Sequence, residues 1–253
     1  MKLPNSSKYY ILFHYSEIGL KGGNRKRFEE QLLKNIRQVL RGVVDTPTIR
    51  SYGRFLTPLP ENFDWPLIQF RLKKVVGLAY FSLAEIVEQD TEKITETASR
   101  HMCSLGFSSF RVTTRRAQKK FLLNSTELST VVGSAIQTQS GARVDLDNPE
   151  AVCYIEIFND HAFVYTERIA GCRGLPVGSS GKAVSLLSSG IDSPVASWKI
   201  ICRGVKLVFL HFHSIPFTTQ ASVRNTRRLV ERLTEYQLAA KLYTVPFLEI
   251  QQS

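Results

Sequence analysis

The sequence has no long hydrophobic run and no signal-peptide pattern. Its apolar stretches all fall short of the roughly 20 residues that a membrane-spanning helix needs. The first residues, MKLPNSSKYY, lack the apolar segment of a secretory signal. We therefore expect a cytoplasmic protein that does not enter a membrane.

Cysteine is also scarce. The four cysteines, Cys103, Cys153, Cys172 and Cys202, form no CxxC pair and show no spacing typical of a metal site. We expect reduced thiols, most of them in the core, and no metal held by these residues.

Acidic residues are outnumbered by basic ones. The 253 residues include 33 Lys and Arg but 22 Asp and Glu, which gives a net charge of +11. Such an excess favours a polyanionic partner, either nucleic acid or an acidic membrane face, with general solubility as the alternative. The length and the apolar fraction of 43% are typical of a soluble protein with two or three domains.

The first region, residues 1–88, alternates strands and helices in a way that predicts a small ferredoxin-like α+β domain. The predicted elements are a strand at 9–16, a helix from Asn24 to about Arg41, a strand or hairpin at 49–59, a helix from Asp64 to near Gly77, and a strand at 78–87. Lys21, Arg25, Lys26 and Arg27 gather at the start of the first helix. Cations there oppose the helix dipole, so they favour contact with an anion over a solvated face.

The second region, residues 89–170, predicts another α+β unit. Its elements are a helix at 91–105, a strand at 110–114, a helix from Asn124 or Ser125 to near Gly141, and strands at 144–146, 152–158 and 162–169 with a turn at Asn159–Asp160.

The densest basic stretch of the chain follows the 110–114 strand. It contains Arg115, Arg116, Lys119 and Lys120, with no acidic residue among them. Basic side chains suit phosphate contacts, and a solvated loop is the alternative. Phe121 comes next and can stack on a base or fill the core, and the core interpretation is favoured.

Residues 171–182 are rich in Gly, Pro and Ser and predict a linker. The remaining residues, 183–253, alternate strands at 183–187, 206–213 and 241–247 with helices at 193–202 and 220–238. This alternation predicts a doubly wound parallel α/β domain. It reaches only three strands by Ser253, so we expect an incomplete domain.

The first strand and helix of this domain are joined by the small polar loop Ser188–Ser193, with Pro194 in the first helical turn. Unpaired backbone N–H groups and the helix dipole favour an anion at such a place, so the loop is a candidate phosphate site. An ordinary strand–turn–helix connection is the alternative.

Several motifs together resemble the tRNA 4-thiouridine synthetases, also called tRNA sulfurtransferases. Tyr15 to Gly22 (YSEIGLKG) with Asn24-Arg25 is similar to the start of the family's ferredoxin-like domain. The 110–121 stretch and Val144 to Pro149 (VDLDNP) resemble its THUMP domain, and Gly174 to Gly178 (GLPVG) resembles its linker. Leu186 to Val195 (LLSSGIDSPV) resembles the loop of PP-loop ATPases, whose usual form is SGGxDS.

The resemblance implies a reaction and its partners. Family members use ATP, with Mg²⁺, to adenylate a uridine of tRNA and then replace its oxygen with sulfur to form 4-thiouridine. The sulfur arrives as a persulfide from a donor such as a cysteine desulfurase, and family members also supply sulfur for the thiazole of thiamine. A homodimer is one assembly that this protein could form.

The resemblance also implies site residues. Asp192 is the expected catalytic residue, as a Mg²⁺ ligand or as the organiser of the loop, with a helix N-cap role as the compatible alternative. His211 is expected to line the nucleotide, and the alternative is that it is an ordinary histidine of the core or the surface. The expected nucleotide-binding residues are Leu186, Leu187, Ser188, Ser189, Gly190, Ser193, His211 and Phe212. The expected RNA-binding residues are Lys21, Arg25, Lys26, Arg115, Arg116, Lys119 and Lys120.

Two departures from the family pattern matter. Ser189 replaces the first glycine of the usual loop, and it would be strained if that position needs a positive φ. The later strands and the sulfur-carrying cysteine of the family have no counterpart here. Three hypotheses follow: a synthetase read as a fragment or truncated product, a non-catalytic tRNA-binding remnant, or another PP-loop enzyme such as a nucleotide-dependent ligase, which the THUMP-like middle argues against.

Overall fold

The computed structural model describes residues 7–15, 17–117 and 121–252. The chain forms two compact units. The first is assembled from Met1–Phe13, Thr46–Phe63 and Phe81–Ile169, and the second from His14–Asp45, Asp64–Tyr80 and Ala170–Ser253. The predicted boundaries after residues 88, 170 and 182 stay predictions.

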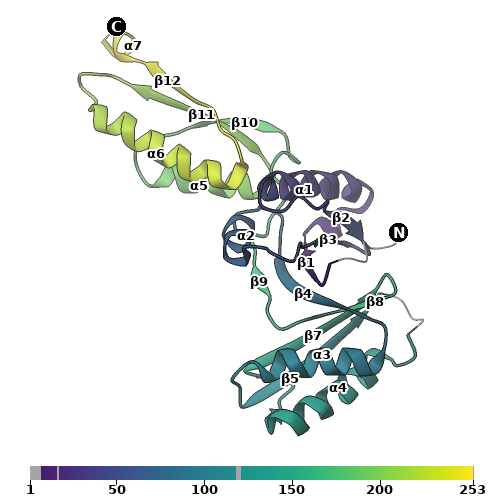
Figure 1. Ribbon diagram of the computed structural model, residues 1–253. Helices are drawn as coiled ribbons and strands as arrows, with labels where there is room; N and C mark the ends of the chain where they lie inside the picture. Colours follow the sequence, from purple (N-terminus) through teal and green to yellow (C-terminus); the bar gives the residue numbers. More distant parts are fainter. Residues whose placement is uncertain (1–6, 16, 118–120, 253) are drawn as a thin grey trace. The chain divides into compact units, whose positions relative to one another are not determined.

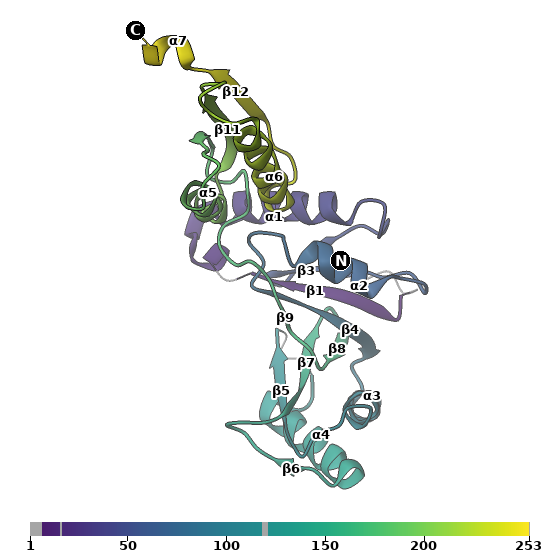
Figure 2. The same ribbon diagram turned by 90° about the vertical axis from the view of Figure 1, so that its left-hand side faces the viewer.

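The first unit is built on a nine-stranded mixed sheet whose strands follow the order β2-β3-β1-β4-β8-β7-β5-β6, with β9 paired to β4. Helices α3 and α4 lie side by side along the β5-β7-β8 part of this sheet (Figure 1, Figure 2). The strands are β1 (Tyr9–His14), β2 (Ile49–Ser51), β3 (Arg54–Pro58), β4 (Tyr80–Glu88), β5 (Ser109–Arg116), β6 (Arg143–Val144), β7 (Ala151–Phe158), β8 (His161–Tyr165) and β9 (Ile169–Ala170), and the helices are α3 (Thr91–Cys103) and α4 (Ser125–Ser140).

Local sequence signals set the turns and helix ends of this unit. Asn159 and Asp160 form the tight turn between β7 and β8 with φ of 53° and 58°, which confirms the predicted hairpin. Asn124 and Glu127 cap α4 reciprocally, and Gly141, with φ of 70°, ends it, as expected. The strand predicted at 110–114 runs on to Arg116, because β5 pairs with β7 from Phe110 to Arg116.

The core of the first unit lies between α3, α4 and the sheet. Ile94, Met102, Leu128, Ile136 and Phe110 are fully buried there. Phe121 is 8% exposed and belongs to the same cluster, so its predicted core position is confirmed. Stacking on a nucleobase is therefore not open to it in this structure.

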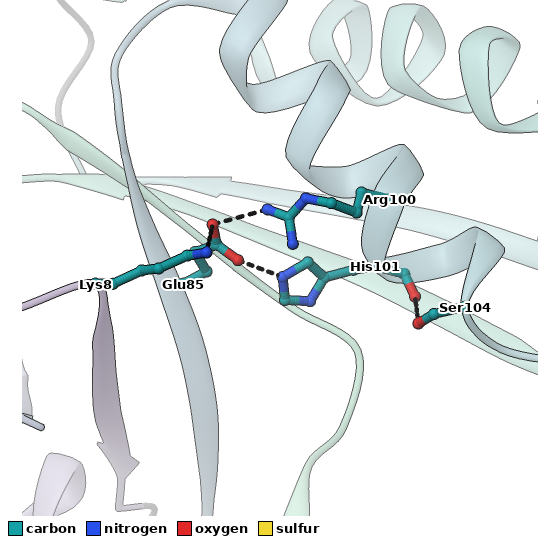
Figure 3. Close-up of polar contacts among 5 residues, drawn as sticks. All are labelled: Lys8, Glu85, Arg100, His101 and Ser104. Atoms are coloured by element: carbon teal, nitrogen blue, oxygen red, sulfur yellow. Dashed lines mark hydrogen bonds and ion pairs between the residues drawn. The ribbon is translucent and has the colours of Figure 1, made fainter. Parts of the chain in front are cut away.

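A buried carboxylate joins β4 to α3 in the first unit. Glu85 accepts from Arg100 and His101, each at 2.7 Å, and the Lys8 ammonium lies 3.6 Å away (Figure 3). Burial alone would raise the pKa of Glu85, but hydrogen bonds from His101 and Arg100 outweigh it and hold this pKa below its usual value of 4.5. The ionised carboxylate is therefore the form that stabilises the fold.

We expect Glu85→Gln to lower the free energy of unfolding by about 2 kcal/mol at pH 7, because Arg100, His101 and Lys8 lose the negative charge and one of the acceptor oxygens that they share. A carboxyl group with a lowered pKa stabilises above its unfolded value, and that stabilisation is lost as the pH falls through the folded value. The variant should therefore unfold with a weaker dependence on pH below about 4.5. Urea unfolding between pH 3 and 7 measures both effects. Glu96→Gln, an exposed position on α3, is the control and should change stability by less than about 0.5 kcal/mol.

The second unit contains a three-stranded parallel sheet in the order β10-β11-β12. Helices α5 and α6 contact each other and lie along this sheet (Figure 1). Leu187, Ile201, Phe209 and Leu233 are buried in its core. The strands are β10 (Lys182–Leu186), β11 (Lys206–His213) and β12 (Leu242–Pro246), and the helices are α1 (Arg25–Leu40), α2 (Trp65–Leu72), α5 (Asp192–Cys202), α6 (Gln220–Gln237) and α7 (Leu248–Gln252).

Of two residues predicted to start helices in this unit, one makes a capping hydrogen bond with its side chain and the other does not. Asp64 caps α2 by accepting from the Leu67 N–H at 2.9 Å, as expected. Asn24 occupies the N-cap of α1, but its side chain makes no capping hydrogen bond. Before α1 the chain forms two short 3₁₀ helices, Glu17–Leu20 and Gly22–Asn24. The first helix of the chain is thus entered through tight turns.

The segment predicted as a linker is packed against the end of α5. The Leu175 N–H donates to the Cys202 carbonyl at 2.9 Å, and the Gly178 and Ser180 N–H groups both donate to the Gly204 carbonyl. Leu175 and Val177 are 4% and 5% exposed. The predicted linker is therefore an ordered segment of the second unit, held by backbone hydrogen bonds and by two buried side chains.

Candidate nucleotide-binding loop and basic surfaces

The loop from Leu187 to Ile191 joins the carboxyl end of β10 to the start of α5. Leu187 extends the strand pairing, since its N–H donates to the Leu210 carbonyl at 2.9 Å. The carboxyl ends of adjacent parallel strands border the ligand crevice in sheets of this kind. The loop thus occupies the position that an anion-binding turn requires.

Serine hydroxyls close the loop on itself. The Ser188 N–H donates to Ser193 Oγ at 3.0 Å, and the two hydroxyl groups lie 2.9 Å apart. The Gly190 N–H donates to Ser188 Oγ at 3.3 Å. These oxygens occupy the inside of the turn, where phosphate oxygens accept from the same N–H groups when an anion binds. The residues present therefore fit a polyphosphate.

Ser189 is not strained. It is absent from the residues with positive φ, so serine is compatible with the backbone conformation at this position. Its hydroxyl accepts from the Ser222 hydroxyl on α6 at 3.0 Å. The departure from the family loop thus adds a link to the next helix.

Asp192 is the first residue of α5, and Ile191 occupies the N-cap. The N-cap alternative for Asp192 is therefore wrong, because the helix begins one residue earlier than that role requires. Its side chain is exposed, and no residue of the described ranges donates a hydrogen bond to it. An ionised carboxylate here accepts only and suits a hydrated Mg²⁺ that is also held by phosphate oxygens.

His211 and Phe212 lie at the end of β11 on opposite faces. His211 is 5% exposed, and its Nδ1 donates to the Leu187 carbonyl at 2.8 Å. Its Nε2 is buried without a partner among the described residues. Phe212 is 42% exposed and packs edge-on against Phe247. Of the two side chains, only that of His211 hydrogen-bonds to Leu187 at the start of the loop.

The basic cluster at the start of α1 is organised by a buried carboxylate. Glu29 accepts from Arg25 Nε at 2.7 Å and from the Tyr15 hydroxyl, and the Tyr15 oxygen also accepts from Arg25 at 3.0 Å. Burial and the bond to Glu29 raise the pKa of Tyr15. The Lys21 ammonium lies 5.3 Å from the Phe28 ring centre, and Lys26 is exposed. Arg25 is thus held in place, while Lys26 is available to an anion.

The second basic stretch divides into two roles. Arg115 is exposed on β5. Arg116 donates to the Phe121 and Leu123 carbonyls at 3.1 and 2.6 Å, so it fixes the chain that follows. Lys119 and Lys120 lie outside the described residues. Their predicted RNA contacts, like those of the other basic residues, stay predictions.

The thiols are mostly shielded. Burial raises the pKa of Cys153 to about 12 and that of Cys172 to about 11. It also raises the pKa of Cys202, while Cys103 is exposed. Within the described ranges, no cluster of three metal-ligating side chains occurs. No helix in that part of the chain is long and apolar enough to cross a bilayer.

Comparison with known families matches three successive parts of the chain. The profile described as “ThiI ferredoxin-like domain” matches residues 10–82, and the THUMP domain profile matches residues 88–167. The profile described as “Thiamine biosynthesis protein (ThiI)” matches residues 178–253.

Similar proteins agree. A “Probable tRNA sulfurtransferase” from Brevibacillus brevis is 40% identical over 95% of this chain and 61% of its own length. One with the same name from Treponema pallidum is 35% identical over 99% of this chain and 63% of its own length. The chain therefore spans less than two thirds of these relatives.

Solved structures give the same result. A 4-thiouridine synthetase–RNA complex with bound ATP has a TM-score of 0.84 and 34% identity, over 96% of this chain and 63% of that one. PH1313 from Pyrococcus horikoshii has a TM-score of 0.83 and 29% identity, over 94% of this chain and 78% of that one. Fold and loop together define a multidomain THUMP protein with part of a PP-loop α/β domain. The chain belongs to the tRNA 4-thiouridine synthetase, or tRNA sulfurtransferase, family.

Proposed function

We propose that this chain binds ATP and tRNA for the sulfur transfer that forms 4-thiouridine. The observation that carries the proposal is the hydroxyl-closed loop Ser188–Ser193, which ends at the exposed Asp192 carboxylate. In the proposed site the loop N–H groups and serine hydroxyls hold the phosphates of ATP. Asp192 would hold Mg²⁺, which would supply charge neutralisation at those phosphates.

The chemistry divides the residues by role. The uridine oxygen would attack the α-phosphate of ATP, and pyrophosphate would leave. The terminal sulfur of a persulfide from a donor such as a cysteine desulfurase would then attack the adenylated carbon, and AMP would leave. A second thiol would break the remaining S–S bond, forming a disulfide with the donor sulfur and releasing 4-thiouridine. The buried Nε2 of His211 is an acceptor that faces no protein donor among the described residues, which supports a place for it beside a ligand. Lys21, Arg25 and Lys26 around the start of α1, and Arg115 on β5, would contact tRNA phosphates.

ATP–pyrophosphate exchange with unmodified tRNA tests the proposal. Exchange that depends on both ATP and tRNA is the expected result. Salt-dependent tRNA binding without any exchange would instead favour the second candidate, a non-catalytic tRNA-binding protein.

We expect Arg115→Glu to weaken tRNA binding about tenfold at moderate salt, because it removes a phosphate contact and adds a repulsive charge. Arg115 is a better choice than Arg116, since Arg116 fixes the neighbouring backbone and its loss would disturb the fold. Filter binding across a potassium chloride series measures affinity and salt dependence. Lys93→Glu, on the exposed face of α3, is the matched charge reversal. Equal losses in the two variants would remove Arg115 from the tRNA-binding surface.

A further inference from the structure

Helix α6 exposes four arginines on its surface. Arg224, Arg227, Arg228 and Arg232 are all exposed. Arg227 and Arg228 follow Arg224 by three and four residues, so these three side chains share one face of the helix. We call Arg224, Arg227 and Arg228 the α6 arginine face.

This face is a cost to the free protein. Like charges at these spacings destabilise a helix by about 0.2–0.5 kcal/mol for each pair. Arg232 has a carboxylate partner, Glu235, at 3.3 Å. Among the described residues, no ion pair joins a carboxylate to the α6 arginine face. The charges are therefore available to an anion from outside the chain.

One residue of the α6 arginine face, Arg228, lies beside the candidate nucleotide loop. Ser222, in the first turn of α6, donates to Ser189 Oγ at 3.0 Å. A hollow of about 560 Å³ lies between Ser189 of the loop and the exposed side of the helix. The rest of its lining comes from α6 and consists of Asn225, Arg228, Leu229, Glu231, Arg232 and Glu235. Ser189 thus belongs both to the loop and to the hollow that Arg228 borders.

We propose that the α6 arginine face binds the sugar–phosphate backbone of the RNA substrate next to the loop. This proposal rests on the proposed function and adds a second RNA-binding surface to it, on the α/β part of the chain. Guanidinium groups suit phosphates because their planar donors bind two oxygens at once. An RNA strand held here passes Ser189, so that one of its nucleotides can reach the loop.

The chemistry of the face favours RNA over other anions. A single nucleotide is accommodated by the loop itself, whereas three cations in a row along a helix match the repeated charges of a polymer. Helices that bind a membrane surface place bulky apolar residues next to their cations. The exposed residues adjoining this face, Asn225 and Glu231, are polar. RNA therefore accounts for both the charge and its spacing.

The test is a double charge reversal, Arg227→Glu with Arg228→Glu, in the full chain. We expect its affinity for unmodified tRNA to fall at least about 30-fold and the salt dependence of binding to weaken by about two phosphate contacts. Its affinity for Mg-ATP should match that of the parent protein, because the substituted side chains are exposed. Its thermal stability should not fall, because the substitutions remove the repulsion with Arg224. The milder double variant, Arg227→Gln with Arg228→Gln, should have a tRNA affinity between those of the parent protein and the double charge reversal.

The matched control is Lys34→Glu with Lys199→Glu, which makes the same change in net charge at exposed positions of α1 and α5. An equal loss of tRNA affinity in control and test variants would overturn the proposal, as would a loss of Mg-ATP binding in place of tRNA binding. If the parent protein binds tRNA and only this comparison fails, the proposed function survives. If the parent protein binds no tRNA, both proposals fall.

Discussion

Asp192→Asn is expected to lower ATP–pyrophosphate exchange about 100-fold or more while leaving tRNA affinity within about twofold. The amide keeps the size of the carboxylate but removes the charge that suits Mg²⁺, so the electrostatic contribution at the leaving pyrophosphate is lost. Its exposed side chain has no donor among the described residues, so no internal hydrogen bond is broken there. Asp192 lies in the first turn of α5, where losing a negative charge costs about 0.5 kcal/mol.

Exchange assays over a Mg²⁺ titration separate this role from a general defect. The variant should need more Mg²⁺ for its remaining activity, whereas a disturbed loop would lose activity at every Mg²⁺ concentration. Asp147→Asn, at an exposed position of the first unit, is the control and should behave as the parent protein. Full exchange activity in Asp192→Asn would show that the carboxylate neither binds the metal nor organises the loop.

Patterns confined to a few neighbouring residues predicted their structures well. The caps at Asp64 and Asn124, the turn at Asn159–Asp160 and the stop at Gly141 depend on hydrogen bonds or backbone angles within about four residues. The strand–loop–helix form of the candidate site is local in the same sense. Such features are encoded where they occur, so the sequence alone predicts them.

Contacts between distant residues were not predictable in this way. Ser222 reaches Ser189 across 33 residues, and no local pattern distinguishes it from other serines in a first helical turn. Arg116 looked like a phosphate ligand by charge alone, yet backbone carbonyls bind its guanidinium. The cations of α6 are visible in the sequence, but their place beside the loop follows only from the fold. Composition gives the number of charges, and tertiary structure decides which are available.

Residues 170–182 approach the end of α5 so closely that a side chain added at Gly174 should destabilise the protein. Gly174 has φ of +74°, and a Cβ atom at this position would lie 2.2 Å from the Cys202 carbonyl oxygen. That oxygen accepts from the Leu175 N–H at 2.9 Å, so the backbone on both sides is already engaged. Any side chain at position 174 must separate this segment from the end of α5.

Gly174→Ala is therefore expected to lower the free energy of unfolding of the second unit by at least about 3 kcal/mol. The positive φ accounts for about 1 kcal/mol, and the clash with its broken hydrogen bond accounts for the rest. Gly181→Ala isolates the first contribution, because Gly181 has φ of +84° but nothing within 4 Å of its added Cβ. Gly106→Ala should show neither destabilising effect, since Gly106 has open space around its added Cβ and no positive φ. Urea unfolding should rank the three variants in that order.

The same substitution connects the linker to the candidate site. Cys202 is the last residue of α5 and Asp192 the first, so a displacement of the helix end is transmitted along a rigid element to the loop. Gly174→Ala should therefore also weaken Mg-ATP binding at temperatures where the protein remains folded, whereas Gly181→Ala should not. Equal stabilities of these two variants would contradict the close approach to Cys202. Normal Mg-ATP binding in a destabilised Gly174→Ala protein would instead restrict the role of this segment to folding.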